Sequence, residues 1–162
     1  MPQYRRARVP DGTFFFTVNL ADRRRSLLVD RIDSLRATVR AVQLAHPFAI
    51  DAMVVMPDHL HAIWTLPCGD ADFSVRWRLI KTRFQSRVGE RGIWQKRFWE
   101  HQIRSARDFE VHADYIHFNP VKHGHAACPW EWPYSSFGRF VAAGRYSADW
   151  AAGEHVRAME RE

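Results

Sequence analysis

The sequence predicts an α+β fold of the ferredoxin-like class, a β-α-β-β-α-β sandwich followed by one additional C-terminal helix. Two observations lead to this class. Strand-like segments and segments with helical periodicity follow one another in that order, and a proline–aspartate pair joins two of the strand-like runs as a hairpin would. A chain of 162 residues has the length of one domain and can bury a core without disulfides or metals. We therefore expect one domain over residues 1–162.

The first predicted strand and helix lie near the N-terminus. From Thr13 the run TFFFTVNL is rich in aromatic and β-branched residues, as a buried strand should be. From about Asp30, apolar residues recur at three- and four-residue spacing until Pro47 ends the pattern; they are Ile32, Leu35, Val39 and Val42. This spacing predicts an amphipathic helix after the first strand.

A hairpin follows this helix. The segments from Phe48 to Met56 and from His59 to Thr65 are both β-type runs. Pro57 and Asp58, which stand between them, are residues that favour tight turns. We expect two antiparallel strands here.

The second predicted helix begins at Asp72 or Ser74, either of which can cap it, and ends near Val88. Gly89 and Gly92 break the helical pattern after that point. The next strand-like segment then completes the sheet.

This fourth strand is expected over residues 97–103, and one more helix follows it. Ser105 with Asp108 resembles a capping box that opens the third helix, and Pro120 is expected to terminate it. Beyond it, the prolines and tryptophans of residues 121–162 suggest an irregular C-terminal tail that packs on the domain through its rings.

The composition excludes several classes of protein. With 46% hydrophobic and 14% aromatic residues, the chain is too apolar to be disordered. The two cysteines form no CxxC pair, so neither a zinc ribbon nor a disulfide framework is indicated, and a reducing cytoplasm is expected. The apolar run from Phe14 to Val18 is far shorter than the ~20 residues of a membrane span, so no membrane partner is expected.

Positive charge is concentrated in one stretch of the chain. The formal net charge is +6, but ten Lys or Arg and two acids between Arg76 and Arg107 give that stretch alone a net charge of +8. Aromatic residues are interleaved with these cations, a mixture that suits single-stranded nucleic acid. The alternative is a core of rings beneath a solvated face of cations. The candidate DNA-binding residues are Arg76, Trp77, Arg78, Lys81, Arg83, Arg87, Lys96 and Arg97.

Two histidine pairs could provide metal ligands. His59 and His61 lie two apart on a predicted strand, so both side chains point to the same face and can share a metal. His123 and His125 are also two apart, but they flank Gly124 in a predicted loop that fixes no common direction. We expect this second pair to consist of surface residues.

The third helix carries a tyrosine and an asparagine at positions i and i+4. Tyr115 and Asn119 are therefore neighbours on one helix face, on the flank of the expected core stripe, and could face the histidines. A phenol near a metal can attack phosphorus to give a covalent phosphotyrosine, and an amide oxygen can complete a mixed nitrogen and oxygen site. Such ligands suit Mg²⁺ or Mn²⁺ better than structural zinc. The alternatives are a half-buried helix residue for Tyr115 and a helix terminator for Asn119.

At these residues the sequence resembles a known family. The segment PDHLHAIW is similar to the His-hydrophobic-His motif of the HUH single-tyrosine transposases, and DYIHFNPVKHG is similar to the tyrosine helix of the REP-associated tyrosine transposases. The resemblance runs from GTFFFTVNLADRRR through WRLIKTRF and RGIWQKRFWEHQIR to WPYSSF. It implies that His59 and His61 are the metal-binding histidines, that Tyr115 is the nucleophile and that Asn119 is the amide metal ligand.

The resemblance implies a ferredoxin-like domain that cuts and rejoins single-stranded DNA beside a palindromic hairpin, with no nucleotide cofactor. We therefore expect a Mg²⁺- or Mn²⁺-dependent endonuclease and strand transferase that acts at REP-type hairpins and leaves a 5′-phosphotyrosine and a free 3′-hydroxyl. The resemblance favours a monomer.

Three other functions stay open. One is a non-catalytic DNA- or RNA-binding domain, although the chain carries nothing like an RNP motif. Another is a domesticated regulator of the same fold that binds hairpins without transferring strands. The last is a metal-dependent hydrolase that attacks with water.

Overall fold

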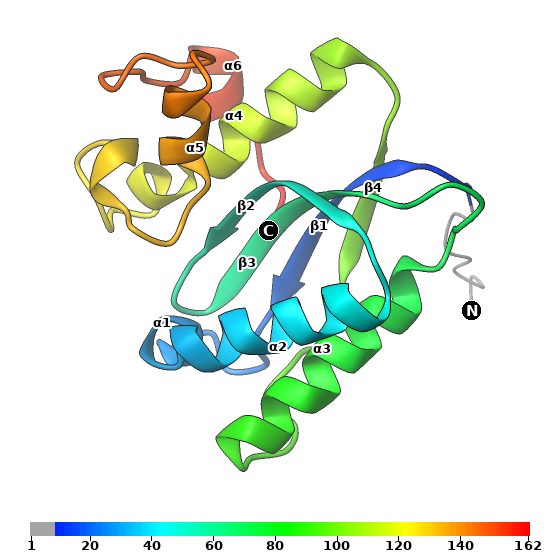
Figure 1. The fold of residues 1–162 in the computed structure, drawn as a ribbon. Helices are drawn as coiled ribbons and strands as arrows, with labels where there is room; N and C mark the ends of the chain where they lie inside the picture. The colour runs from blue at the N-terminus through cyan, green and yellow to red at the C-terminus, as the bar shows by residue number, and fades with distance from the viewer. Residues whose placement is uncertain (1–8) are drawn as a thin grey trace, which may run out of the picture.

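A four-stranded antiparallel sheet forms the centre of the computed structural model, which describes residues 9–162 (Figure 1). The strand order is β2-β3-β1-β4, and each neighbouring pair is antiparallel. The helical segment between β1 and β2 and the helix between β3 and β4 each connect two strands that have a third strand between them. This is the predicted ferredoxin-like arrangement, and the fold class is confirmed. The strands are β1 (Thr13–Asn19), β2 (Ala49–Val55), β3 (His59–Thr65) and β4 (Trp99–Ile103).

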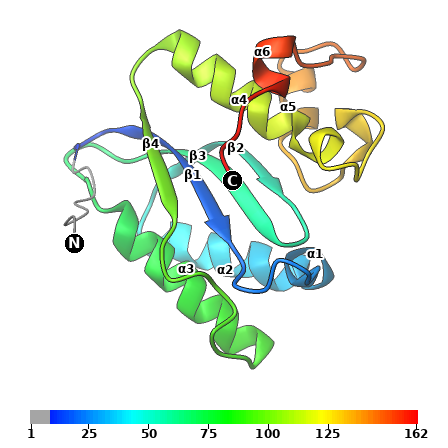
Figure 2. The same cartoon turned by 180° about the vertical axis from the view of Figure 1, so that it is seen from behind.

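Helices cover both faces of the sheet. Figures 1 and 2 show α2 and α3 side by side on one face, and α4 on the other face with α5 and α6 beyond it. The helices are α1 (Leu27–Asp30), α2 (Ile32–Ala45), α3 (Phe73–Val88), α4 (Ala106–Lys122), α5 (Phe137–Ala142) and α6 (Glu154–Arg157), with one 3-10 turn, η1, at Pro129–Glu131. The additional helix that carries Tyr115 is α4, and it packs on the face that α2 and α3 leave open.

The double covering explains why the interior of β1 is mostly apolar. Phe14, Phe16 and Val18 enter the core beneath α2 and α3, whereas Phe15 enters the core beneath α4. Successive side chains of a strand point to opposite faces, so a strand that is buried on both faces reads as a continuous hydrophobic run. Thr17 is the polar exception, and it faces the α4 side.

The prediction that Pro120 ends the tyrosine helix is wrong, because α4 continues to Lys122. A proline has a helical φ, and in the last turn of a helix its missing N–H removes only one backbone hydrogen bond. The carbonyls of this turn are taken up by the following loop: the N–H of His123 donates to Asn119 O at 3.0 Å, and that of His125 to Pro120 O at 2.9 Å.

Two predicted DNA-binding residues, Arg76 and Trp77, are core residues instead. Trp77 is 1% exposed and stacks on Trp64 with ring centroids 4.1 Å apart. Arg76 is 3% exposed, and its guanidinium donates to Asp70 at 2.7 Å and to three backbone carbonyls. These partners satisfy a buried cation and tie the start of α3 to the end of α2. The prediction that these two side chains contact DNA is therefore wrong.

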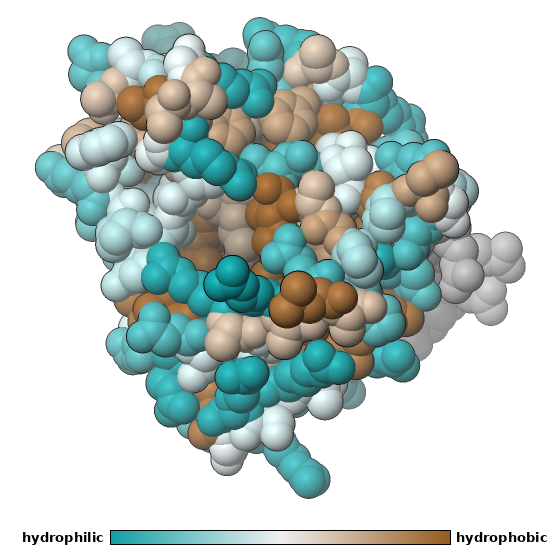
Figure 3. Space-filling model, in the orientation of Figure 1, coloured by the Kyte–Doolittle hydropathy of each residue, from teal (hydrophilic) through white to brown (hydrophobic). Residues whose placement is uncertain are grey.

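An apolar hollow lies between α2 and the segment around residues 134–136, and Figure 3 shows it. Its walls include Val39, Ile50, Met53 and Tyr134. None of the predicted catalytic or metal-binding residues lines it. Among residues 9–162, no helix has the length and hydropathy needed to cross a membrane.

Candidate active site

Two histidines of β3 point toward α4 at the start of the strand. His59 is 1% exposed and His61 is fully buried, and both lie on the α4 side of the sheet. Both residues follow directly after the turn of the β2–β3 hairpin. In the sheet, His61 is paired with Thr17 of the neighbouring strand β1. The structure therefore gives the two imidazoles the common face that their spacing predicts.

The ring of His59 is oriented by a carboxylate. His59 Nδ1 lies 2.8 Å from Asp58 Oδ1, and Arg23 Nε donates to the other oxygen of Asp58 at 2.6 Å. Burial raises the pKa of Asp58, but the hydrogen bonds from His59 and Arg23 outweigh it and lower the pKa to about 2. An ionised Asp58 accepts the Nδ1 proton, which fixes the ring with Nε2 directed at Asn119 of α4.

The ring of His61 is oriented by a hydroxyl. Its Nδ1 lies 2.8 Å from Thr17 Oγ1, and the Thr17 hydroxyl donates its own proton to the carbonyl of Arg161. Thr17 therefore accepts the Nδ1 proton, and burial lowers the pKa of His61 to about 4, which keeps the ring neutral. Its Nε2 is buried and has no hydrogen-bond partner among the described residues.

Helix α4 brings an amide and a phenol to these rings. Asn119 Oδ1 lies 3.1 Å from His59 Nε2, and the ring of Tyr115 meets that of His61 edge-on at 5.2 Å. Both α4 residues are fully buried. The structure thus brings together the four residues that the sequence singled out for catalysis and metal binding.

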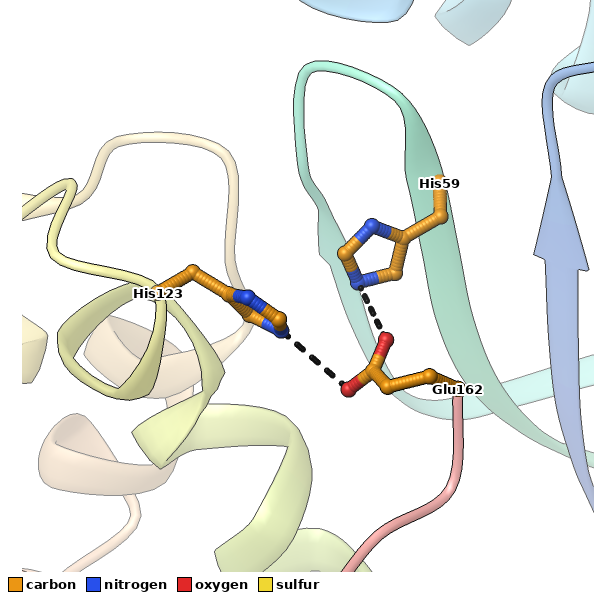
Figure 4. Close-up of side chains that lie close together, drawn as sticks. All are labelled: His59, His123 and Glu162. Carbon is orange, nitrogen blue, oxygen red and sulfur yellow. Dashed lines mark hydrogen bonds and ion pairs between the residues drawn. The ribbon is translucent and has the colours of Figure 1, made fainter. Parts of the chain in front are cut away.

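Glu162 extends into the middle of this group from the C-terminal segment (Figure 4). Its Oε2 lies 3.1 Å from His59 Nε2, and its Oε1 lies 3.2 Å from His123 Nε2. Burial raises the pKa of Glu162, but the hydrogen bond from His123 and the nearby imidazoles outweigh it and lower the pKa overall. The carboxylate marks a position at which the surroundings favour negative charge.

The donor set fits a divalent cation. The Nε2 atoms of His59 and His61, the amide oxygen of Asn119 and the carboxylate of Glu162 all offer lone pairs to one small volume. His59, His123 and Glu162 also have ligand atoms that lie within 4.8 Å of one another. Imidazole nitrogens combined with oxygen ligands can hold a divalent metal ion.

The hydroxyl of Tyr115 is held in a hydrogen-bond network. It donates to Glu162 Oε1, accepts from the N–H of Arg161 at 3.2 Å, and lies 3.5 Å from Lys122 Nζ. Burial, and after it the bond to Glu162, raises the pKa of this phenol. Tyr115 therefore keeps its proton while Glu162 is its partner, and Lys122 is the cation placed to stabilise a phenolate.

The sequence analysis missed four residues of this site: Thr17, Lys122, His123 and Glu162. A signal for His123 exists, because Tyr115, Asn119 and His123 follow one another at four-residue spacing and so share a helix face. A helix that ended at Pro120, as predicted, would leave His123 in the following loop and off this face. His123 is exposed, as predicted, yet it bonds Glu162, whereas the ring of His125 packs on Trp132 at 5.5 Å.

The cations of α3 lie away from these residues. Helix α3 covers the face of the sheet opposite to α4, so its side chains do not join the tyrosine and the histidines. Lys81 donates to the Gln95 carbonyl at 2.9 Å and lies beside the ring of Phe98, and Arg83 is half-buried. Among the candidate DNA-binding residues, the exposed ones are Arg78, Arg87, Lys96 and Arg97.

Comparison with known proteins places this site in a family, although no family model matches the chain. A REP-associated tyrosine transposase of Escherichia coli (strain K12) is 52% identical over 151 residues, which cover 93% of this chain and 92% of that protein. A protein of Haemophilus influenzae, provisionally named as another such transposase, is 38% identical and covers 97% of each chain.

A solved structure agrees with the sequence comparison. It is the structure of a REP-associated tyrosine transposase bound to a REP hairpin, and it matches with a TM-score of 0.92 and 51% identity over 94% of this chain and 93% of that one. Sequence identity at this level over nearly the whole length shows membership of the same family as well as the same fold. The chain belongs to the REP-associated tyrosine transposases.

Proposed function

We propose that this protein is a divalent-metal-dependent single-stranded DNA endonuclease and strand transferase that acts at REP-type hairpins. The observation that carries the proposal is the meeting of a buried tyrosine with two buried histidines and an amide oxygen, all directed at the place that the Glu162 carboxylate occupies. A buried constellation of this kind is costly for a fold and is typical of a functional site.

The proposed ligands are His59, His61 and Asn119. Asp58 and Thr17 hold the two imidazoles in the tautomer that leaves each Nε2 free to ligate. A bound Mg²⁺ or Mn²⁺ would polarise the oxygens of the scissile phosphate. The chain itself orients these ligands and excludes water from around them.

Tyr115 is the proposed nucleophile. Its oxygen attacks phosphorus, the bond from phosphorus to the 3′-oxygen breaks, and a 5′-phosphotyrosine forms. The phenol gives up one proton and the departing 3′-oxygen takes up one, so the step is balanced. Lys122 stands 3.5 Å from the phenol oxygen, where its charge favours the phenolate. Attack by a second 3′-hydroxyl reverses the step on another strand and completes the transfer.

The protein is proposed to act as a monomer in the cytoplasm. His59, His61, Tyr115 and Asn119 converge within one chain, so the chemistry needs no residue from a second copy. Both cysteines are free thiols, which suits a reducing compartment.

Covalent trapping tests the proposal. The wild-type protein is incubated with a single-stranded DNA hairpin and Mn²⁺ or Mg²⁺, and a denaturing gel is used to look for protein that carries attached DNA. We expect the adduct with wild type and none with Tyr115→Phe, which removes one oxygen but keeps the ring contacts with His61 and Phe15. Hairpin binding by Tyr115→Phe should stay close to that of wild type.

The other functions give different results in the same assay. A hydrolase would cut the DNA without an adduct, and Tyr115→Phe would still cut. A binding regulator would shift the hairpin on a native gel and give neither product. His61→Ala, which removes a proposed metal ligand, should lose the metal-dependent adduct. His125→Ala is its matched control, because the ring of His125 packs on Trp132 outside the site.

A further inference from the structure

Trp99 is an exposed ring on the catalytic face of the sheet. It begins β4 and is 42% exposed, unlike the buried tryptophans of the core. Its ring contacts that of Phe15 edge-on, and Phe15 also contacts the ring of Tyr115. Trp99 therefore lies on the same face as the tyrosine, near the edge of the sheet.

The sheet register connects Trp99 to the histidines. Thr17 pairs with His61 on one side and with Trp99 on the other, so the three residues form one row across β3, β1 and β4. Neighbouring strands lie about 4.8 Å apart, which places the backbones of Trp99 and His61 roughly 10 Å apart. One nucleotide can bridge a gap of that size between its phosphate and its base.

The last two residues of the chain cross this row. Residue 161 spans its middle, because its carbonyl accepts from Thr17 and its N–H donates to Tyr115. Its guanidinium lies over the Trp99 ring at 5.6 Å from the centroid, while the carboxylate of Glu162 lies among the histidines. A flat cation thus lies over the indole while a carboxylate lies among the histidines.

We propose that Trp99 is a base-stacking residue of the active site. It receives the base of one of the two nucleotides that flank the scissile phosphate, in the place that Arg161 takes here. The inference deepens the proposed function and rests on it. DNA that binds in this way displaces the side chains of Arg161 and Glu162 from the row.

The surroundings of Trp99 suit a base better than a phosphate. The indole offers a flat apolar surface and no charge, and stacking on such a ring tolerates any base. The ring of His101 lies nearly parallel to it, with an interplanar angle of 8°. Phe15 and His101 support the indole, so the ring itself is already oriented for a base once Arg161 has left it.

A cycle of protein and DNA changes tests the pairing. The scissile phosphate is first mapped with wild-type protein on a hairpin that has single-stranded flanks. Binding is then measured in the Tyr115→Phe background, with intact DNA and with DNA that is abasic at either flanking nucleotide. Stacking is worth about 1 to 3 kcal/mol per base, so one of the abasic sites should weaken binding by about five-fold or more.

The result with Trp99→Ala decides the inference. We expect this variant to bind intact DNA more weakly and to be insensitive to the abasic site, whereas Trp99→Phe keeps part of the sensitivity. Each comparison uses two DNAs on one protein, so partial unfolding cannot imitate the pattern. Trp130→Ala is the control, because Trp130 is 56% exposed and packs against Phe137 instead.

Two outcomes overturn the inference. Either both flanking abasic sites leave binding unchanged, or Trp99→Ala keeps the full sensitivity of its parent. If wild type nevertheless forms the covalent adduct, the proposed function stands and only the role of Trp99 fails. If wild type neither binds nor cuts hairpin DNA, both proposals fail.

Discussion

Thr17 is a hydroxyl in a strand that is otherwise apolar in its interior. It is fully buried, and its oxygen accepts from His61 while its proton goes to the Arg161 carbonyl. Without this acceptor the Nδ1 proton of His61 would be buried and unpaired, and the ring would lose the partner that fixes its tautomer. A single side chain therefore determines which nitrogen of His61 faces the site.

We expect Thr17→Val to weaken metal binding about 10- to 100-fold, the usual cost of losing a partner that orients a metal ligand. The shape of the side chain is kept and the hydroxyl is lost. Titration calorimetry with Mn²⁺ measures the effect, and Thr17→Ser, which retains the oxygen, should bind nearly as wild type does. Equal affinity of the valine and serine variants would show that Thr17 does not orient His61.

At the residue scale, the sequence predicts the face on which a side chain lies wherever that face follows from the periodicity of a single strand or helix. His59 and His61 share a strand face, and Tyr115 and Asn119 share a helix face, so spacing predicts both pairings, while the family resemblance implies their roles. It does not identify Thr17, whose role depends on the register between β1 and β3. Glu162 is similarly hidden, because only the tertiary path of the C-terminal segment brings it to His59.

Helix α3 shows that the charge of a helix does not determine which of its charged side chains face the solvent. Arg76, Ile80 and Phe84 follow one another at four-residue spacing and form its buried stripe. Composition assigns Arg76 to the cationic surface, but Asp70 and the nearby carbonyls satisfy it inside the fold. The sequence therefore predicts the helix and its net charge correctly, while the direction of a single arginine depends on partners that the sequence does not place.

The outward cations of α3 remain candidates for contact with the hairpin. If DNA phosphates lie along this helix, Arg83→Gln and Arg87→Gln should each weaken hairpin binding about equally for different sequences. Each should also flatten the log–log dependence of affinity on salt by up to about one unit. Binding measured by fluorescence anisotropy across a salt series checks this.

The control for these variants is Arg157→Gln, since the Arg157 guanidinium donates to the Ala152 carbonyl at 2.7 Å and lies over the ring of Phe118. Its salt slope should match that of wild type. Unchanged slopes in both α3 variants would mean that the hairpin lies elsewhere and that the cations of α3 form a solvated face.

At the scale of the whole molecule, the sheet separates two cores, and the site belongs to only one of them. The core beneath α2 and α3 is mostly aromatic and aliphatic, whereas the α4 side buries several histidines, including His112 and His117. His117 lies between Ser136 at 2.7 Å and Tyr146 at 3.2 Å, so its two nitrogens bind the segment after α4 to the helix. The catalytic face is therefore also the face with buried titratable groups.

These histidines predict a fold that weakens in mild acid. Burial lowers the pKa of His117 to about 3, helped by the charges of Arg139 and Arg145, and burial also lowers the pKa of His112. The ring of His117 is neutral in the folded protein, while the unfolded chain binds its proton near pH 6.5, and the lowered pKa of His112 acts in the same direction. The unfolded state therefore gains more protons as pH falls below about 6.5, and the free energy of unfolding decreases.

We expect the urea midpoint of the metal-free protein to fall between pH 7.5 and pH 5, with each buried histidine contributing up to about 1.4 kcal/mol per pH unit. The hydrogen bond from Arg76 lowers the pKa of Asp70 to about 2. The stability that this carboxylate contributes is therefore lost only below about pH 4, outside this window. His117→Gln keeps a polar side chain but cannot take up the proton, so its midpoint should depend less on pH. His125→Gln, at an exposed position, should follow wild type. Identical pH dependence in wild type and His117→Gln would show that His117 does not supply this acid sensitivity.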